Sequence, residues 1–201
     1  MTIPHWNYAR WGLAVVIALC AFWIGTHQAH SAMKIKADVE TFVFNGPWYT
    51  DDFGAKEATP MTRAYTAVVG LLALSRQETL YYMAREDSDG EPMTADYVYE
   101  ITGGDLPSRW WSITLYGDDH FLLDNEYGKF SVKATDLERE EDGTFKVVIS
   151  REPQPGNWIP MAGEAGEEVS LLLRMYNPND GVLDRLQDID MPEIRRVRKA
   201  S

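Results

Sequence analysis

Hydrophobic and polar positions follow three different patterns along the chain. Residues 11–26 read WGLAVVIALCAFWIGT and carry no charged side chain. Residues 59–75 place apolar side chains at helical spacing, and from about residue 80 onward apolar and polar side chains alternate. The sequence therefore predicts an apolar helix, then an amphipathic helix, and then a series of short β-strands.

The uncharged run at residues 11–26 favours a transmembrane anchor. At 1.5 Å per residue it spans about 24 Å, and extension back to Trp6 reaches the roughly 30 Å of a hydrocarbon core. Aromatic side chains lie near both ends, as they do at membrane interfaces: Trp6, Tyr8, Trp11, Phe22 and Trp23. We expect the N-terminus to lie in the cytoplasm and the globular domain outside.

Two alternatives to an uncleaved anchor stay open. A cleaved signal peptide requires two small residues before the cut, and His30-Ser31-Ala32 supplies only one of them. A buried soluble helix is disfavoured because the run has no amphipathic periodicity. The predicted organisation is a tail at 1–10, an anchor at 11–26, a juxtamembrane linker at 27–45 and a β-sandwich domain at 46–198.

The amphipathic helix has recognisable boundaries. Thr59 suits the N-cap and Pro60 the first helical position, and the periodic pattern ends near Ser75. Ser75 and Glu78 match a capping box, which predicts one further short helical turn.

Eight segments beyond this helix read as strands separated by turn signals. Short strands at this spacing indicate a mainly β fold, an antiparallel sandwich with the amphipathic helix packed on it, and not a parallel α/β sheet. The predicted strands are 80–86, 94–102, 109–116, 120–124, 129–135, 145–151, 169–176 and, as an edge strand, 192–198.

Size and charge limit the possible functions. A chain of 201 residues with 45% hydrophobic content holds one well-cored domain plus an appendage. The 31 acidic and 19 basic side chains give a formal net charge of −12, which repels nucleic acid, so we expect no nucleic-acid partner. Cys20 is the only cysteine, so the globular part folds without a disulfide.

Familiar catalytic motifs are missing from the sequence, including a phosphate loop, a dinucleotide fingerprint, a nucleophile elbow and a zinc-protease helix. Residues 87–90, Asp-Ser-Asp-Gly, are interpreted as a plain turn because the glutamate that closes a calcium loop is not at the right spacing. His27 and His30 lack a third metal ligand, and His120 lacks a nucleophile. We expect no metal, no cofactor and no catalytic residue.

Two adjacent tryptophans in the 109–116 strand are the most informative side chains. Neighbouring strand residues point to opposite faces, so Trp111 is expected in the core and Trp110 on the other face. Aromatic and hydroxyl side chains on that face make a candidate surface for a sugar or amphipathic ligand, with Trp158 closing over it from a loop: Trp110, Ser112, Thr114, Tyr116 and Trp158. The alternative, which we favour, is that Trp110 packs against the helix or a loop.

A set of short motifs occurs in order along the predicted sandwich. They are Gly46-Pro47-Trp48, Thr62-Arg63-Ala64, Leu74-Ser75-Arg76, Tyr81-Tyr82, the 110–116 segment, Asn125, the segment Gln154 to Pro160, and the segment Leu173 to Pro178. Together, from about residue 46 to 194, they resemble the bacterial family called domain of unknown function twelve-fourteen.

The resemblance implies a jelly-roll-like β-sandwich in the bacterial envelope. Larger relatives carry an N-terminal domain of a sister family, twelve-fifty-four, where this chain has its apolar segment. The family offers no catalytic residues, and its motif residues are expected to be structural: Gly46, Pro47, Trp48, Arg63, Asn125, Asn157, Arg174 and Tyr176. Asn157 fits a turn, Trp158 fits a plug, and Arg174 beside Tyr176 is expected to hydrogen-bond or stack across the sandwich.

Two functions of different classes fit these features. The first is a membrane-anchored, non-catalytic binding or accessory module of the envelope, in contact with other inner-membrane subunits. The second is a carbohydrate-acting hydrolase or isomerase, which needs two acidic residues about 5 to 10 Å apart beside Trp110 and Tyr116. The acidic runs at 118–119, 138–142 and 164–168 lie beside turns, where solvent exposure is the usual outcome, and the first function is favoured.

Overall fold

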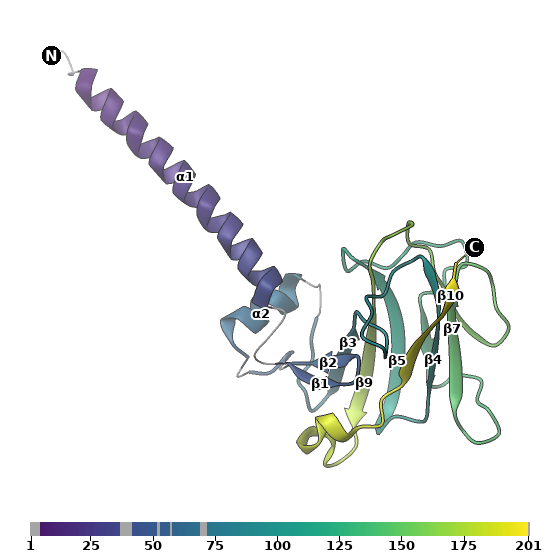
Figure 1. Cartoon of the computed structure of the whole chain (residues 1–201). Coiled ribbons are helices and arrows are strands. Elements are labelled where there is room, and N and C mark those ends of the chain that lie inside the picture. The colour runs from purple at the N-terminus through teal and green to yellow at the C-terminus, as the bar shows by residue number, and fades with distance from the viewer. Residues whose placement is uncertain (1–4, 37–41, 52, 57, 69–71, 201) are drawn as a thin grey trace. The chain divides into compact units, whose positions relative to one another are not determined.

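The computed structural model describes residues 5–36, 42–51, 53–56, 58–68 and 72–200 (Figure 1). The chain divides into two compact units, Met1–Glu40 and Thr41–Ser201. The first unit contains a single helix, and the second contains the β-strands and the remaining helices.

The helix of the first unit, α1, runs over His5–Lys36 and is longer than the predicted 11–26. It continues through the polar segment predicted as a linker, because residues 27–36 are mostly good helix formers with no proline or glycine. One part of it, Tyr8–Ala29, is long and apolar enough to cross a membrane.

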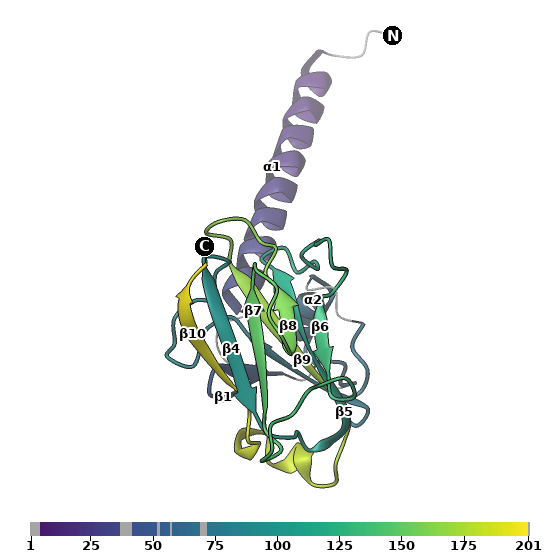
Figure 2. The same ribbon diagram turned by 90° about the vertical axis from the view of Figure 1, so that its right-hand side faces the viewer.

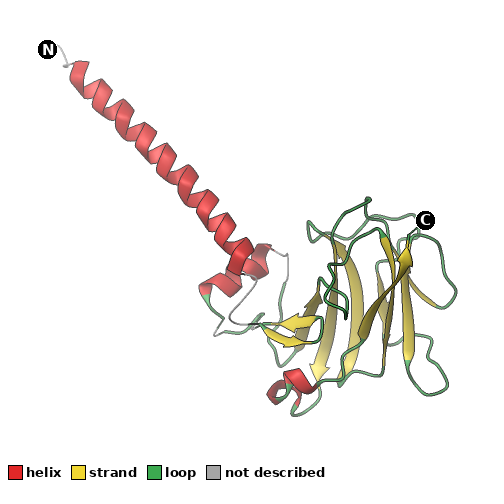
Figure 3. Ribbon diagram, in the orientation of Figure 1, coloured by secondary structure: helices red, strands yellow, loops and turns green. Residues whose placement is uncertain are grey.

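The second unit is a sandwich of two β-sheets (Figures 2 and 3). One sheet has six strands in the order β1-β2-β3-β9-β5-β6, and the other has four in the order β10-β4-β7-β8. The strands are β1 Val43–Asn45, β2 Trp48–Thr50, β3 Thr79–Ala84, β4 Tyr97–Gly103, β5 Ser108–Gly117, β6 Ser131–Lys133, β7 Phe145–Ser150, β8 Asn157–Pro160, β9 Val169–Pro178 and β10 Glu193–Lys199. Two 3₁₀ turns, Val182–Asp184 and Leu186–Asp188, lie between the last two strands.

The core lies between the two sheets and follows the alternation of each strand. Inward-facing side chains of both sheets form one buried cluster, with Trp111, Ile113 and Leu115 from β5 packed among residues of β4 and β7 such as Tyr99 and Ile149. The mainly β sandwich predicted from the alternating pattern is thus observed, and Trp111 fills its core as expected.

Three strands and one pairing differ from the prediction. The short strands β1, β2 and β8 were not expected, and β1 lies within the segment assigned to the linker. All strand pairs are antiparallel except β7 with β8, which are parallel although only residues 151–156 connect them. β8 runs parallel to β7 at the edge of its sheet, so the expectation of a wholly antiparallel sandwich was wrong at this pair.

The amphipathic helix, α2, runs over Pro60–Val68 and is shorter than predicted. The Thr62 amide donates to the Thr59 hydroxyl at 3.1 Å, which is the expected N-cap. Residues 69–71 lie outside the described residues. The predicted capping box forms a single turn, in which the side chains of Ser75 and Glu78 hydrogen-bond at 2.8 Å. The helix contacts the sheet through Tyr65, whose hydroxyl lies 4.0 Å from the sulfur of Met83 on β3, and the Tyr65 ring lies 6.1 Å from that of Phe53.

The predicted strand at 120–124 is a turn instead. The His120 amide donates to the Gly117 carbonyl at 3.1 Å, and the Gly117 amide donates to the Phe121 carbonyl at 3.0 Å. His120 adopts φ 65°, in the left-handed region, which a strand does not allow. Of the predicted strand, only an isolated antiparallel bridge between Leu122 and Tyr116 is present.

Replacement of Trp111 tests the core. Its ring is 1% exposed and packs 5.0 Å from the Phe145 ring, and its indole N–H donates to Asp105 Oδ1 at 3.0 Å. Trp111→Ala should lower the free energy of unfolding by about 3–5 kcal/mol, because it leaves a large cavity. Urea denaturation of the full-length protein in mild detergent measures this loss. Trp110→Ala is the matched control and should cost less than half as much; equal losses would contradict the assignment of the two faces.

The turn at His120 predicts a pH dependence of stability. Burial, and next the charge of Arg85, lower the pKa of His120 below its usual value, against the opposing effect of Asp119 and Asp118. A lowered pKa means that the folded state binds fewer protons, so this contribution to stability is present above pH 6.5 and is lost as the pH falls through the folded pKa.

His120→Asn removes the titration and keeps a residue type that tolerates positive φ. The variant should match the wild type near pH 8 and be the more stable of the two near pH 5, as measured by thermal unfolding at both values. A wild-type advantage that grows on acidification would show that the sign is wrong.

Candidate functional site

The predicted ligand surface lies on the outer face of the six-stranded sheet, which we define as the face turned away from the core. The pleat of β5 places Trp110, Ser112, Thr114 and Tyr116 on this face, as predicted. Strand β9, which pairs with β5, adds its own outward residues in register: Trp110 faces Tyr176, Ser112 faces Arg174, and Tyr116 faces Ser170. The fold therefore brings the four predicted β5 residues together with two residues assigned to structural motifs.

Arg174 makes hydrogen bonds to two hydroxyl groups of this face and lies beside one aromatic ring. It donates from Nη1 to Thr114 Oγ1 at 3.2 Å and from Nη2 to Tyr116 Oη at 2.8 Å, and its guanidinium carbon lies 5.8 Å from the Tyr116 ring centre. We call these three residues the Arg174 cluster. The expected hydrogen bond therefore runs along the face of one sheet and not across the sandwich.

Trp110 packs on the neighbouring strand. Its ring centre lies 5.2 Å from that of Tyr176 at an interplanar angle of 59°, and both side chains are half-buried. The described ring contact of Trp110 is this cross-strand aromatic pair, and its packing against the helix or a loop stays a prediction. Part of each ring stays open to solvent beside the Arg174 cluster.

Trp158 lies elsewhere. It is on β8, in the four-stranded sheet, and is 6% exposed. Its indole N–H donates to the carbonyl oxygen of Ser150 at 3.0 Å, and Tyr127 covers it with a ring contact of 4.9 Å. The structure does not bring Trp158 to the β5 face, and its burial fits the plug suggested by the sequence.

The predicted motif residues at positions 46–63 form a hairpin turn and side-chain hydrogen bonds to backbone carbonyl groups. Gly46 has φ 61° and Pro47 follows it in the two-residue hairpin turn that joins β1 to β2, a combination suited to a type II′ turn. Trp48 is fully buried and donates from its indole to the Pro192 carbonyl at 2.7 Å. Arg63 donates to the Ala58 carbonyl at 3.1 Å.

The side chains of the two predicted asparagines also hydrogen-bond to backbone amide and carbonyl groups. Asn125 accepts from the Lys129 amide at 3.3 Å and donates to the Leu123 carbonyl at 3.1 Å, within the β5–β6 connection. Asn157 begins β8 and does not lie in a turn; it accepts from the Glu138 amide at 2.8 Å and donates to the Glu138 carbonyl at 2.7 Å. Both therefore have a structural role.

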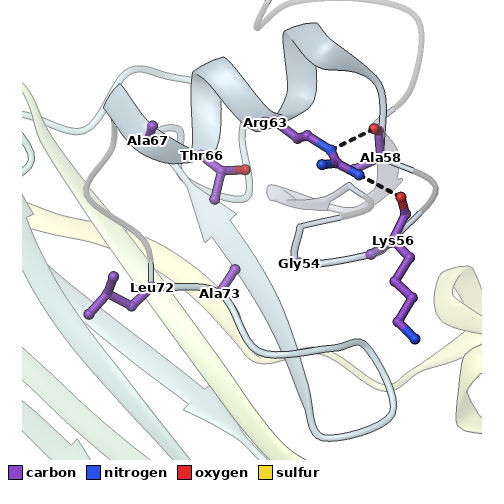
Figure 4. Close-up of a pocket in the computed structure, with 9 residues that line it drawn as sticks. Gly54, Lys56, Ala58, Arg63, Thr66, Ala67, Leu72 and Ala73 are labelled. Carbon is purple, nitrogen blue, oxygen red and sulfur yellow. Dashed lines mark hydrogen bonds between the residues drawn. The ribbon is translucent and has the colours of Figure 1, made fainter.

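A hollow of about 630 Å³ lies beside α2 (Figure 4). Arg63, Lys56, Thr66 and Leu72 line it, but the Arg63 guanidinium donates to two backbone carbonyls of its own wall, those of Ala58 and Lys56. The Nε and Nη2 groups of Arg63 are thereby occupied by the wall of the hollow itself.

The described carboxylates do not form a metal-binding group. Over residues 5–36, 42–51, 53–56, 58–68 and 72–200, no group of three or more potential metal ligands gathers. Asp87 accepts from the amides of Asp89 and Glu91 at 3.1 and 3.0 Å, so it closes a hairpin turn, as expected. A hydrogen bond from the Trp111 indole, with further effects of Arg139, lowers the pKa of Asp105, which suits a permanently ionised structural carboxylate and not a general acid.

Lys133 was missed as a member of the outer face. It lies on β6 opposite Ser112, which in turn lies opposite Arg174, so one cross-strand row contains two cationic side chains. Its face was not predicted because the pairing of β6 with β5 cannot be deduced from the alternation of a three-residue strand.

Comparison with one solved structure supports the fold. The VPA0106 protein from Vibrio parahaemolyticus superposes with a TM-score of 0.56 at 22% identity, over 71% of this chain and 36% of that protein. A putative uncharacterized protein from Burkholderia cenocepacia gives a TM-score of 0.39 at 24% identity, over 60% of this chain and 29% of that protein. This chain thus spans about a third of the length of the solved structures it matches.

None of the curated proteins matches this chain. The family model described as "Protein of unknown function (DUF1214)" matches residues 78–180, slightly more than half of the sequence, from the start of β3 to the end of β9. With the ordered motifs and the two-sheet sandwich already described, this match shows that the chain belongs to the DUF1214 family.

Proposed function

We propose that this protein is a membrane-tethered, non-catalytic binding module of the bacterial envelope. In this proposal α1 spans the inner membrane, the N-terminus is cytoplasmic, and the sandwich lies in the periplasm. The observation that carries it is the exposure of large apolar side chains along α1, where Trp11, Phe22 and Trp23 are 72%, 73% and 68% exposed. A helix that is apolar on every side is stable only inside a protein or a membrane.

The outer face of the six-stranded sheet is the binding surface that this proposal favours. On β5 and β9 its polar side chains include the half-buried Tyr116 and Arg174, whereas Ser112 and Thr114 are only 6% and 7% exposed. Among the described residues, no carboxylate lies within 4.0 Å of the Arg174 guanidinium. The geometry thus supports binding over hydrolysis.

The tether is tested by placing charge in the middle of the apolar span. Ile17→Lys with Leu19→Lys should move the full-length protein out of the membrane fraction after an alkaline wash, because each lysine costs about 2.5–3.5 kcal/mol at the bilayer centre. The control is His27→Lys with Gln28→Lys, which adds the same charge near the end of the span, where lysine reaches the interface. That control should stay in the membrane.

Two results would contradict the tether. One is release of the wild-type protein by the wash. The other is an intact mass showing that residues before the sandwich are removed, which is the outcome for a cleaved signal peptide.

A partner within the membrane is the second part of the proposal, and Cys20 offers a direct test. It is the only cysteine in the sequence and lies on the exposed surface of α1. A membrane-permeable reagent with a thiol-reactive group at one end and a photoreactive group at the other should couple to Cys20 and, on illumination, insert into a neighbouring helix, which joins it to the 22.9 kDa chain and gives a heavier species. Cys20→Ser should abolish that species; a wild-type sample that stays monomeric would count against an inner-membrane complex.

A further inference from the structure

Acidic charge is distributed unevenly along the sandwich unit. Residues 41–77, which include β1, β2 and α2, contain three acidic and three basic side chains and have no net charge. Residues 78–201 contain 26 acidic and 13 basic side chains, a net charge of −13. The net negative charge of the unit therefore lies entirely in the sequence that begins with β3.

The neutral segment exposes large apolar side chains. Leu72 is 96% exposed, Phe44 on β1 is 54% exposed, and Leu74 is 44% exposed. Single exposed apolar side chains are ordinary on protein surfaces, whereas a contiguous group of them indicates an interaction site. Whether these three side chains are connected therefore decides their meaning.

Printed contacts connect them. The ring centres of Phe44 and Phe42 lie 6.3 Å apart, and those of Phe42 and Phe53 lie 6.4 Å apart. Gly54, the next residue, packs so tightly against the backbone of Leu74 that an added Cβ would clash with its carbonyl group. A continuous series of contacts thus leads from Phe44 to Leu74.

The hollow beside α2 extends this region to Leu72. Leu72 and Gly54 both line it, and most of its other lining residues are alanines (Figure 4). Lys56 is exposed at the same hollow and offers a cation to a phosphate group. We call Phe42, Phe44, Leu72 and Leu74 the apolar patch.

A second exposed apolar group of the sandwich has the opposite electrostatic setting. Phe121 is 73% exposed and Leu122 45% exposed, in the connection from β5 to β6. Residues 118–127 around them contain four acidic side chains and no lysine or arginine. Anionic lipid headgroups repel such a stretch and do not repel the neutral apolar patch.

The covalent chain keeps the apolar patch within reach of a bilayer that α1 crosses. The helix continues to Lys36, about 10 Å beyond the end of its apolar span at Ala29. Residues 37–42 can extend by at most about 20 Å more. The patch therefore begins within about 30 Å of the end of the span, whatever path the connection takes.

We propose that the apolar patch binds the surface of the membrane that α1 spans, with Phe44 and Leu72 in the headgroup region and residues 78–201 turned toward the solvent. This inference rests on the proposed function, because it requires α1 to be the tether. The tether raises the effective concentration of the patch at the bilayer, so a small apolar contact is sufficient. Lys56 adds attraction to lipid phosphates.

The test uses the full-length protein with Cys20→Ser and one new cysteine: Phe44→Cys, Leu72→Cys or Phe121→Cys. Each cysteine carries the fluorophore NBD, and the protein is reconstituted into liposomes of phosphatidylcholine and phosphatidylglycerol. Lipids with a nitroxide near the headgroup should quench NBD at positions 44 and 72 by at least about half, because side chains of an interfacial patch enter the headgroup boundary by about 5–10 Å. NBD at position 121 should keep nearly all of its fluorescence.

A charge within the patch tests whether its apolar character causes the contact. Leu72→Glu should restore most of the NBD fluorescence at position 44, since a carboxylate resists entry into the headgroup boundary of an anionic bilayer. The matched control is Leu122→Glu, which adds the same charge at an exposed leucine outside the patch and should leave the quenching at position 44 unchanged. Urea midpoints in mild detergent establish that each variant is folded.

Three results would overturn the inference: no quenching at positions 44 and 72, quenching at position 121 as strong as at position 44, or quenching that Leu72→Glu leaves unchanged. In each case the tether stands if the labelled protein floats with the liposomes in a density gradient. Protein that does not float with them would overturn the tether and the patch together, so the two failures are distinguishable.

Discussion

The pairing of β5 with β9 determines what both faces of the six-stranded sheet present. These strands are the two longest of the sandwich and pair from Ser108 with Pro178 to Gly117 with Val169. Because side chains alternate with a period of two, a shift of one residue would move Arg174 into the core and expose Leu173. Burial of the apolar alternate residues therefore fixes the register, and the register places Arg174 beside Thr114 and Tyr116. The polar site is a consequence of the packing of the core.

The edge strands of the two sheets are short or charged, which opposes pairing with a strand of another chain. Edge strands β1 and β6 have three residues each, and β8 has four and ends at Pro160. The fourth edge strand, β10, is longer and carries several arginines, whose charge and bulk oppose pairing with another strand. Arg196 also lies over the Tyr97 ring at 4.3 Å, which holds the edge close to its neighbour. All four edges of the sandwich therefore oppose edge-to-edge association.

Much of this arrangement could be predicted from the sequence, and the errors have physical causes. Long alternating strands with apolar inner faces, such as 109–116 and 169–176, were located to within two residues, because burial imposes their period. The three-residue strands were missed, since a period of two has no signal over so short a length. The uncharged run of α1 was recognised, but its end was placed at residue 26 because hydropathy marks the apolar span and not the last helical residue.

In the candidate site, too, features that depend on one strand could be predicted, and features that depend on the pairing of two strands could not. The facing of Trp110, Ser112, Thr114 and Tyr116 depends only on alternation within one strand, so the sequence was sufficient. The approach of Arg174 depends on which strand pairs with β5 and in which register, and 58 residues separate it from Tyr116. Trp158 was assigned to the wrong face for a related reason: its loop was expected to fold over β5, whereas residues 157–160 pair with β7. Single-strand patterns thus predict which residues share a face, and only the pairing shows which charges meet there. In this sandwich, that pairing places the Arg174 guanidinium beside the hydroxyls of Thr114 and Tyr116.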